Sequence, residues 1–203
     1  MIYTTPEEWP DDPHQLFEDW MSTAEQTEIN DANAMCLATV GADQMPSTRI
    51  VLLKGHDPSG FVFFTNTESR KGEQLRQNQK AALNFHWKSL RRQIRIEGEV
   101  SFVSSDEADA YFQTRPRESR IGAWASRQSR PLPVREEFDQ RYKSYEQQFK
   151  AQDSIPRPPH WTGYRVAPLR MEFWIQEEFR LHQRCLYEPV SGQFFWQKTM
   201  LYP

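Results

Sequence analysis

The chain lacks the glycine-rich loops that many proteins use to bind a phosphate. It has 8 glycines among 203 residues, and no two of them are adjacent. The sequence contains no GxGxxG dinucleotide fingerprint, no P-loop and no GxSxG nucleophile elbow. Any phosphate group that this protein binds must therefore be held by side chains and helix ends.

Cysteine and other metal ligands are also sparse. Cys36 and Cys185 are the only cysteines, and the apolar neighbours of Cys36 favour a buried thiol over a disulfide. No CxxC pair and no cluster of histidine with cysteine indicates a metal site. Cys36 has no adjacent base, and no carboxylate pair indicates glycosidase chemistry. If the protein is an enzyme, its reaction is therefore expected to depend on a bound organic cofactor.

Long hydrophobic runs and a strong charge imbalance are absent too. No apolar run reaches membrane-spanning length, and the acidic residues 1–13 lack the apolar core of a signal peptide. The net charge of −3 gives no reason to expect nucleic acid or an anionic membrane as a partner. The sequence predicts a soluble cytoplasmic protein whose local groups of cations serve a small anionic ligand.

The pattern of apolar residues predicts one mainly β domain over residues 12–203, preceded by a mobile N-terminal arm over residues 1–11. A helix begins at Asp12-Pro13, and three strands that follow in quick succession suggest an antiparallel meander. Many short strands with helices between them are typical of a β-barrel with peripheral helices. The expected strands span residues 34–40, 47–54, 60–65, 81–87, 91–103, 163–167, 170–175, 179–188 and 194–198, and the later helices 69–78, 104–114, 119–126 and 134–149.

The segment from Arg49 to Lys71 is the strongest candidate for a phosphate site. Two apolar strands lead into a helix that Ser69 caps, and Arg70 and Lys71 add charge at the helix start, where the dipole favours an anion. A surface helix with solvated cations is the alternative. Arg49 and Lys54 are five residues apart, so in a regular strand their side chains would point to opposite faces. They can contact the same ligand only if the strand bends or the ligand wraps around its end.

Three further groups of polar residues are candidates. Gln93 lies in an alternating strand whose polar outer face is the more ordinary explanation, although its amide also suits the edge of a heterocycle. Tyr111, Arg115 and Ser119 are spaced four apart across a helix break, where a basic solvent-exposed loop is the alternative. Arg180, His182 and Arg184 share one face of a predicted strand, which favours an anion site.

Together these segments resemble the pyridoxamine 5′-phosphate oxidase family. The resemblance runs from about Asp12 to Pro203 and rests on the ordered motifs RIVLLK, TN-x-x-SRK, RP-R-x-S-x-IGAW-x-S-x-QS, EFW and RLH-x-R. It implies a split β-barrel and a homodimer with FMN at the subunit interface. It also implies oxidation of pyridoxamine or pyridoxine 5′-phosphate to pyridoxal 5′-phosphate, with hydride passing from C4′ to flavin N5 and oxygen being reduced to hydrogen peroxide.

The resemblance also implies roles for individual residues. Arg180 and His182 would be the catalytic pair that flanks the substrate ring, together with Leu181, and Lys54, Tyr111, Arg115 and Ser119 would hold the substrate phosphate. The FMN phosphate would lie at Arg49, Arg70 and Lys71. The rest of the flavin site would comprise Ile50, Val51, Leu52, Leu53, Lys54, Phe64, Thr65, Gln93, Gln128, Ser129, Trp174 and Arg184; no metal is implied.

Three departures from the family pattern leave alternatives open. Residues 1–10 lack the Arg-Arg-x-Tyr element usual on the family's N-terminal arm, Trp174 is followed by Ile175-Gln176 in place of Gln-Gly, and Gln183 replaces the usual Asp. One alternative is a related flavin oxidase that acts on another reduced heterocycle, as in phenazine pathways. The other is a flavin-binding or pyridoxal-phosphate-binding module without turnover.

Overall fold

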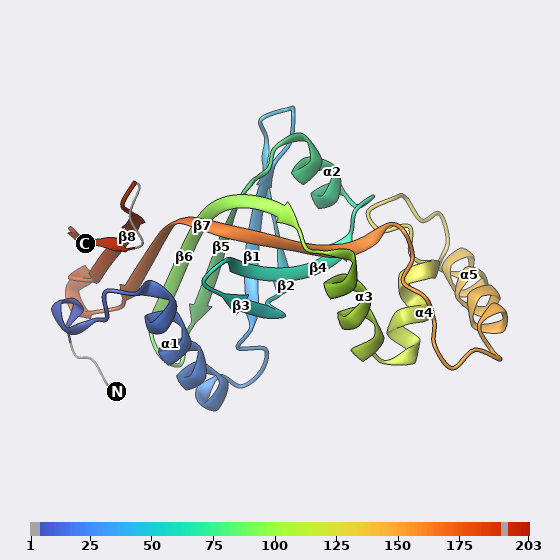
Figure 1. The fold of residues 1–203 in the computed structure, drawn as a ribbon, viewed down its shortest axis with the longest axis horizontal. Coiled ribbons are helices and arrows are strands. Elements are labelled where there is room, and N and C mark those ends of the chain that lie inside the picture. The colour runs from blue at the N-terminus through green and yellow to red at the C-terminus, as the bar shows by residue number, and fades with distance from the viewer. Residues whose placement is uncertain (1–4, 192–194) are drawn as a thin grey trace.

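The protein is built on one strongly curled sheet with helices around its edges (Figure 1). The computed structural model describes residues 5–191 and 195–203. The sheet order is β2-β1-β5-β6-β7-β4-β3, and β8 pairs with β7 and β9. The strands are β1 Ala34–Val40, β2 Pro46–Leu52, β3 Gly55–Asp57, β4 Gly60–Asn66, β5 Lys80–Trp87, β6 Arg92–Phe102, β7 Trp161–Ile175, β8 Gln183–Pro189 and β9 Trp196–Leu201.

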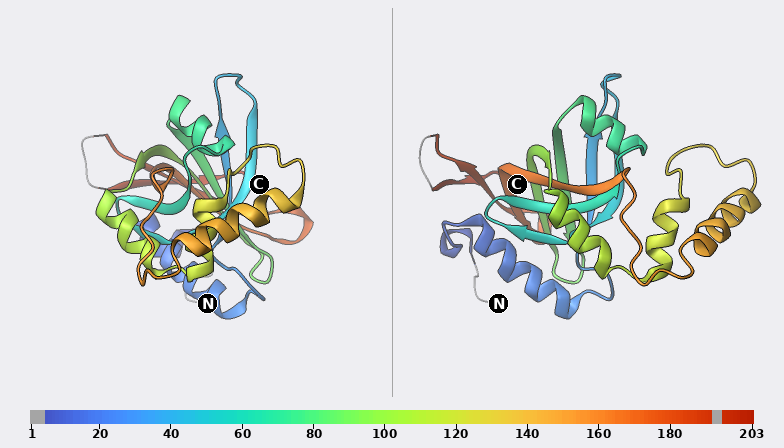
Figure 2. Two further views of the ribbon diagram at one scale, coloured as in Figure 1. Left: turned by 90° about the vertical axis from the view of Figure 1, so that its right-hand side faces the viewer. Right: turned by 45° about the vertical axis from the view of Figure 1, so that its right-hand side comes forward.

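The helices lie at opposite ends of the sheet (Figure 2). Helix α1 (Pro13–Thr27) packs near the chain ends, whereas α3 (Ser105–Thr114), α4 (Arg117–Ala125) and α5 (Arg135–Gln148) gather at the other end, and α2 (Arg70–Gln77) lies apart from both groups. Two 3-10 turns, η1 (Pro6–Glu8) and η2 (Glu178–Arg180), complete the secondary structure of the described residues. The expected mainly β fold with peripheral helices is confirmed.

The main core lies between α1 and the concave side of the sheet. Phe17 of α1 contacts Phe61 and Phe85 edge to face, with ring centroids 4.9 and 5.3 Å apart, and Trp20 meets Phe173 at 5.3 Å. Alternate residues of β1 are buried, as Met35 and Leu37 are, because successive side chains of a strand point to opposite faces. On the other, outer face, β5 and β6 carry polar residues such as Asn84 and Arg95, whereas β1 presents small residues such as Cys36 and Ala38.

Three predicted helix starts are confirmed by their caps, whereas α4 begins at Arg117, two residues before its predicted start, and has no side-chain cap. The Asp12 carboxylate accepts from the His14 N–H at 2.9 Å, Ser69 Oγ accepts from the Gly72 N–H at 3.3 Å, and Ser104 Oγ accepts from the Glu107 N–H at 3.1 Å. Each bond satisfies a backbone donor that the first turn of a helix leaves without a partner. Local side-chain chemistry explains why these boundaries are readable in the sequence.

Two predictions about the strands up to β7 are wrong. The first strands do not form a meander: β1 pairs with β2, but β4 pairs with β3 and β7. The strands expected at 163–167 and 170–175 are one continuous strand, β7, which passes through Pro168 at an irregularity in its pairing with β6. Proline has no N–H for the ladder and is tolerated where the pairing is irregular, so it bends this strand without ending it.

The segment before α1 packs on the folded domain, with Pro6 and Trp9 buried. Trp9 is buried against Trp20, with ring centroids 5.3 Å apart. Tyr187 Oη donates to the Pro10 carbonyl and Lys198 Nζ to the Trp9 carbonyl, both at 2.9 Å. The predicted mobile arm over residues 1–11 therefore has anchored residues, residues 1–4 lie outside the described part, and the domain boundary stays a prediction.

Candidate functional site

A cavity of about 660 Å³ lies where β2 and β4 meet α2 and the turn between α3 and α4. It brings together most residues of the predicted flavin and phosphate sites from segments far apart in the sequence. Arg49 and Lys54 both line it, because β2 ends at Leu52 and Lys54 lies beyond the regular strand. Its lining is Arg49, Ile50, Val51, Leu52, Lys54, Phe64, Thr65, Lys71, Tyr111, Thr114, Arg115, Pro116, Gln128 and Trp161.

One wall of this cavity, hereafter the cationic cavity, is a stack of aromatic rings. Phe64 stacks on both Tyr111 and Trp161, with ring centroids 4.0 and 5.2 Å away, and Tyr111 and Trp161 are 6.2 Å from each other. The planes of the three rings are within 16° of parallel. The Arg115 guanidinium lies over the Trp161 ring at 4.9 Å. Its NH1 atom is buried with no hydrogen-bond partner among the described residues, and burial lowers the pKa of Arg115. A buried N–H donor without a partner in the protein is suited to an acceptor atom of a bound ligand.

Arg49 lines the cationic cavity as a half-buried residue and is held there by neutral groups. Its NH1 atom donates to Thr39 Oγ1 at 2.5 Å, and its NH2 atom donates to Ser47 Oγ at 2.6 Å. Burial, and then the charge of Arg70, lower the pKa of Arg49. The guanidinium is oriented by the protein, and its charge is not neutralised by these contacts.

Lys71 is the second oriented cation. Its Nζ atom donates to Gln128 Oε1 at 3.0 Å and to Thr65 Oγ1 at 3.2 Å. Burial, and then the charge of Arg49, lower the pKa of Lys71 to about 8. Within residues 5–191 and 195–203, neither Lys71 nor Arg49 forms an ion pair with a carboxylate. Two partly buried cations that repel each other are an arrangement suited to a bound anion.

A second cavity, of about 420 Å³, lies at the loop between β7 and β8. It is lined by Trp174, Gln176, Glu177, Glu178, Phe179, Arg180 and His182. The predicted strand over 179–188 is wrong at its start, because β8 begins at Gln183 and Arg180 lies in the turn η2. Arg180 and His182 therefore come together through a turn and not through the period of a strand.

Arg184 lies on the outer face of the sheet beside this second cavity, hereafter the loop cavity. Its Nε atom donates to Glu172 Oε1 at 2.8 Å, and Arg95 NH1 donates to the other oxygen of Glu172 at 3.0 Å. Arg184 NH1 also donates to the Tyr202 carbonyl at 3.1 Å. Gln93 pairs with Trp174 in the sheet register, so the predicted residues Gln93, Trp174 and Arg184 lie on neighbouring strands.

The cationic cavity and the loop cavity lie at opposite ends of β7. Figure 1 shows β7 as the long strand that crosses the sheet. Trp161, the first residue of β7, lines the cationic cavity, and Trp174, next to its last residue, lines the loop cavity. At about 3.3 Å per residue, the strand path between these two residues is roughly 40 Å. Within one chain, the two halves of the predicted site do not meet.

Some predicted residues do not line either cavity. The Leu53 side chain is buried in the core and only 6% exposed. Arg70, Ser129 and Leu181 are exposed, and Ser119 lies on α4 without lining the cationic cavity. Sequence reasoning missed Trp161 and Thr114 in the cationic cavity, and Glu177 and Phe179 in the loop cavity. The aromatic residues of β7 could have indicated Trp161 as a candidate. Its stacking on Phe64 could not be predicted from the sequence, because it depends on the pairing of distant strands.

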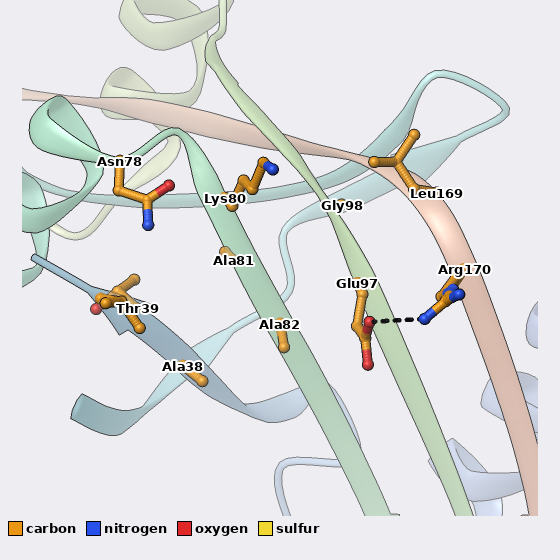
Figure 3. A pocket seen from close by; sticks show the side chains of 11 residues that line it. Ala38, Thr39, Asn78, Lys80, Ala81, Ala82, Glu97, Gly98, Leu169 and Arg170 are labelled. Atoms are coloured by element: carbon orange, nitrogen blue, oxygen red, sulfur yellow. Dashed lines mark ion pairs between the residues drawn. The ribbon is translucent and has the colours of Figure 1, made fainter. Parts of the chain in front are cut away.

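A third hollow, of about 460 Å³, lies on the outer face of β1, β5, β6 and β7 (Figure 3). Small residues such as Ala38 and Ala82 form its floor, and the Arg170 guanidinium lies 4.0 Å from Glu97. This hollow has no stack of rings and no pair of oriented cations, so it is not suited to a phosphorylated cofactor. Within the described chain, no helix is long and apolar enough to cross a membrane.

Comparison with known proteins shows which family the sequence matches. Residues 21–149 match the family described as pyridoxamine 5′-phosphate oxidase, and residues 161–203 match the pyridoxine 5′-phosphate oxidase C-terminal dimerisation region. A pyridoxine/pyridoxamine 5′-phosphate oxidase of Zymomonas mobilis is 54% identical over 95% of this chain and 98% of its own length. One from Sphingopyxis alaskensis is 55% identical over 95% of this chain and 88% of its own.

Two solved structures share the fold. PhzG from Burkholderia lata 383, in complex with tetrahydrophenazine-1-carboxylic acid, has a TM-score of 0.91 and 30% identity, over 100% of this chain and 98% of its own. A pyridoxamine 5′-phosphate oxidase-related, FMN-binding protein from Nostoc punctiforme has a TM-score of 0.74 at 18% identity, over 96% and 100%, which shows the fold alone. The sheet is thus the expected split barrel, and the chain belongs to the pyridoxamine 5′-phosphate oxidase family.

Proposed function

We propose that this protein oxidises pyridoxamine or pyridoxine 5′-phosphate to pyridoxal 5′-phosphate with bound FMN. The observation that carries the proposal is the cationic cavity, where Arg49 and Lys71 are oriented, partly buried and without a carboxylate partner among the described residues. Such a pair fits a phosphate, and the stack that contains Phe64 suits a ligand with a planar ring. The relatives named as this oxidase, at 54 and 55% identity, support the same reaction.

The residues of the cationic cavity fit FMN. Arg49 and Lys71, with Arg70 at the start of α2, would hold its phosphate, where the N-terminus of the helix adds a favourable dipole. The strand residues 50–52, with Thr65 and Gln128, would line the rest of the cofactor. When bound, FMN supplies the acceptor that takes hydride from substrate C4′ at N5 and passes the electrons to oxygen as hydrogen peroxide.

The substrate would be held by both cavities. Arg115, with its buried and unpartnered NH1 atom, is suited to the substrate phosphate, together with Lys54, Tyr111 and Ser119. Arg180 and His182, in the loop cavity, would contact the substrate ring and hold it in the geometry for hydride transfer. This chain's contribution to the reaction is therefore orientation and charge.

A homodimer would bring the two cavities together. The loop cavity of one chain would meet the cationic cavity of its partner, since the strand path of roughly 40 Å separates them within one chain. The match of residues 161–203 to a dimerisation region supports this arrangement. The outer face of the sheet also exposes apolar side chains, with Ile50 65% and Leu52 37% exposed, as expected of a surface that a second copy covers.

One assay tests the proposal. The purified protein is expected to be yellow, and with pyridoxamine 5′-phosphate under air it should form aldehyde and hydrogen peroxide in equal amounts. Flavin without turnover on either vitamer would instead support a binding module. Because PhzG is 30% identical, a reduced phenazine precursor is the substrate for comparison. Oxidation of that compound, with no oxidation of either vitamer, would favour a related flavin oxidase that acts on another reduced heterocycle.

A further inference from the structure

Two residues that the proposed function does not use close the loop between β7 and β8. Gln183 Nε2 donates to Glu177 Oε1 at 2.9 Å. Because a carboxylate only accepts, the amide nitrogen of Gln183 must face Glu177. The amide oxygen of Gln183 is then buried and has no partner among the described residues. This Glu177–Gln183 hydrogen bond, hereafter the latch, joins the two ends of the loop that carries Arg180 and His182.

The loop needs such a restraint because its backbone is strained. Phe179 and Arg180 have φ values of 54° and 67°, in the left-handed region that residues other than glycine adopt at an energetic cost. Packing contributes little, since Phe179 is 86% exposed and Leu181 66% exposed. Inside the loop, the Leu181 N–H donates to the Glu178 carbonyl at 3.1 Å. The latch is the side-chain contact that ties this strained turn to the start of β8.

The same loop determines the tautomer of the His182 ring. The backbone N–H of Glu177 donates to His182 Nδ1 at 3.2 Å. Nδ1 must therefore carry the lone pair, which places the proton of the neutral imidazole on Nε2. The ring is also held near Trp174, with centroids 4.7 Å apart. His182 thus presents an N–H donor from Nε2.

We propose that Glu177 and Gln183 are positioning residues: the latch keeps the Glu177 amide against Nδ1, so that His182 donates from Nε2 to an acceptor atom of the substrate. The contribution to turnover rests on the proposed function, whereas the tautomer does not. The amide at position 183 matters for this geometry, because a carboxylate there would face the Glu177 carboxylate with no proton to share.

The tautomer is measured directly on the flavin-loaded protein with ¹⁵N-labelled histidine. The His182 signals are identified by their loss in His182→Gln, and the Nε2–H form is expected in the wild type. Gln183→Glu and Gln183→Ala should both shift His182 towards a mixture of forms. Glu177→Gln combined with Gln183→Glu exchanges donor and acceptor and should restore the Nε2–H form. Gln197→Glu, which adds the same charge on β9, serves as the control.

Steady-state kinetics form the second arm. Gln183→Glu should lower kcat/KM for pyridoxamine 5′-phosphate about tenfold or more while the flavin content stays constant, because misplaced groups reduce turnover steeply. The exchanged double variant should recover. An unchanged tautomer in both single variants, or no recovery in the double variant, overturns the proposal. The wild type could show the Nε2–H form, and the variants the expected change of tautomer, while the protein oxidises neither vitamer. That result would contradict the proposed function and would still support the role of the latch in setting the tautomer.

Discussion

At the scale of single residues, the site is defined by cations whose charge is not balanced. Arg49 donates to hydroxyl groups, Lys71 donates to an amide and a hydroxyl, and Arg115 has one buried atom with no partner among the described residues. Elsewhere on the chain the pattern is different, because Arg157 and Arg165 form ion pairs of 2.7 Å with aspartates. The sequence showed which cations were present; it did not show which lack carboxylates, since that depends on the fold.

Lys71→Ala should weaken FMN binding, because it removes one charge-assisted hydrogen bond to the phosphate. Such bonds contribute about 1.5–3 kcal/mol, or roughly a 10- to 100-fold rise in Kd. Titration of the flavin-free protein, followed by quenching of flavin fluorescence, measures the change. Lys143→Ala removes an exposed lysine of α5 and should bind FMN as the wild type does. Equal Kd values for Lys71→Ala and the wild type would remove Lys71 from the phosphate site.

FMN affinity should also fall as the pH rises through about 8, the pKa of Lys71 in the free protein. A bound phosphate stabilises the charged ammonium and raises this pKa, so binding takes up a proton above pH 8 and is favoured at lower pH. The Kd measured from pH 7 to 9.5 should rise in the wild type. Lys71→Arg keeps its charge and should show a smaller rise. A flat profile in the wild type contradicts the assignment.

At the scale of elements, β7 contributes residues to both cavities. Its first residue, Trp161, stacks in the cationic cavity, and Glu172 near its other end holds Arg184 and Arg95. The sequence predicted the capped helix starts, because Asp12, Ser69 and Ser104 act within a turn of their own positions. It did not predict the pairing of β4 with β7, because that contact joins segments about a hundred residues apart and depends on the whole sheet.

Gly163 of β7 is a small residue for a reason that the structure identifies. A Cβ atom there would lie 2.7 Å from the Phe64 ring and 2.7 Å from Val103. Gly163→Ala should therefore displace Phe64 from its stack and destabilise the fold by about 1–3 kcal/mol. Urea unfolding gives the stability, and KM for the substrate should rise as well. Gly55→Ala, where a Cβ atom meets nothing within 4 Å, is the matched control. Similar stability of the two variants would contradict the steric argument.

At the scale of the whole molecule, the proposed site requires two copies of the chain, because the two cavities lie at opposite ends of β7. The family resemblance led to the residues of both cavities, and the structure separates those residues to opposite ends of one sheet. No pattern in a single sequence shows that two groups of residues lie too far apart to meet within one chain. The apolar residues on the outer face, such as Ile50 and Leu52, gave no such signal, because alternation predicts which residues share a face and not what covers it.

Subunit complementation tests the central claim most directly. One variant carries Lys71→Ala with Arg115→Ala, which disables the cationic cavity, and the other carries Arg180→Ala with His182→Ala, which disables the loop cavity. Each alone should form an inactive dimer. In a randomly mixed population, half of the dimers have one intact site, so we expect about a quarter of wild-type activity. No recovery from mixed dimers that form normally would show that the two cavities do not combine across subunits.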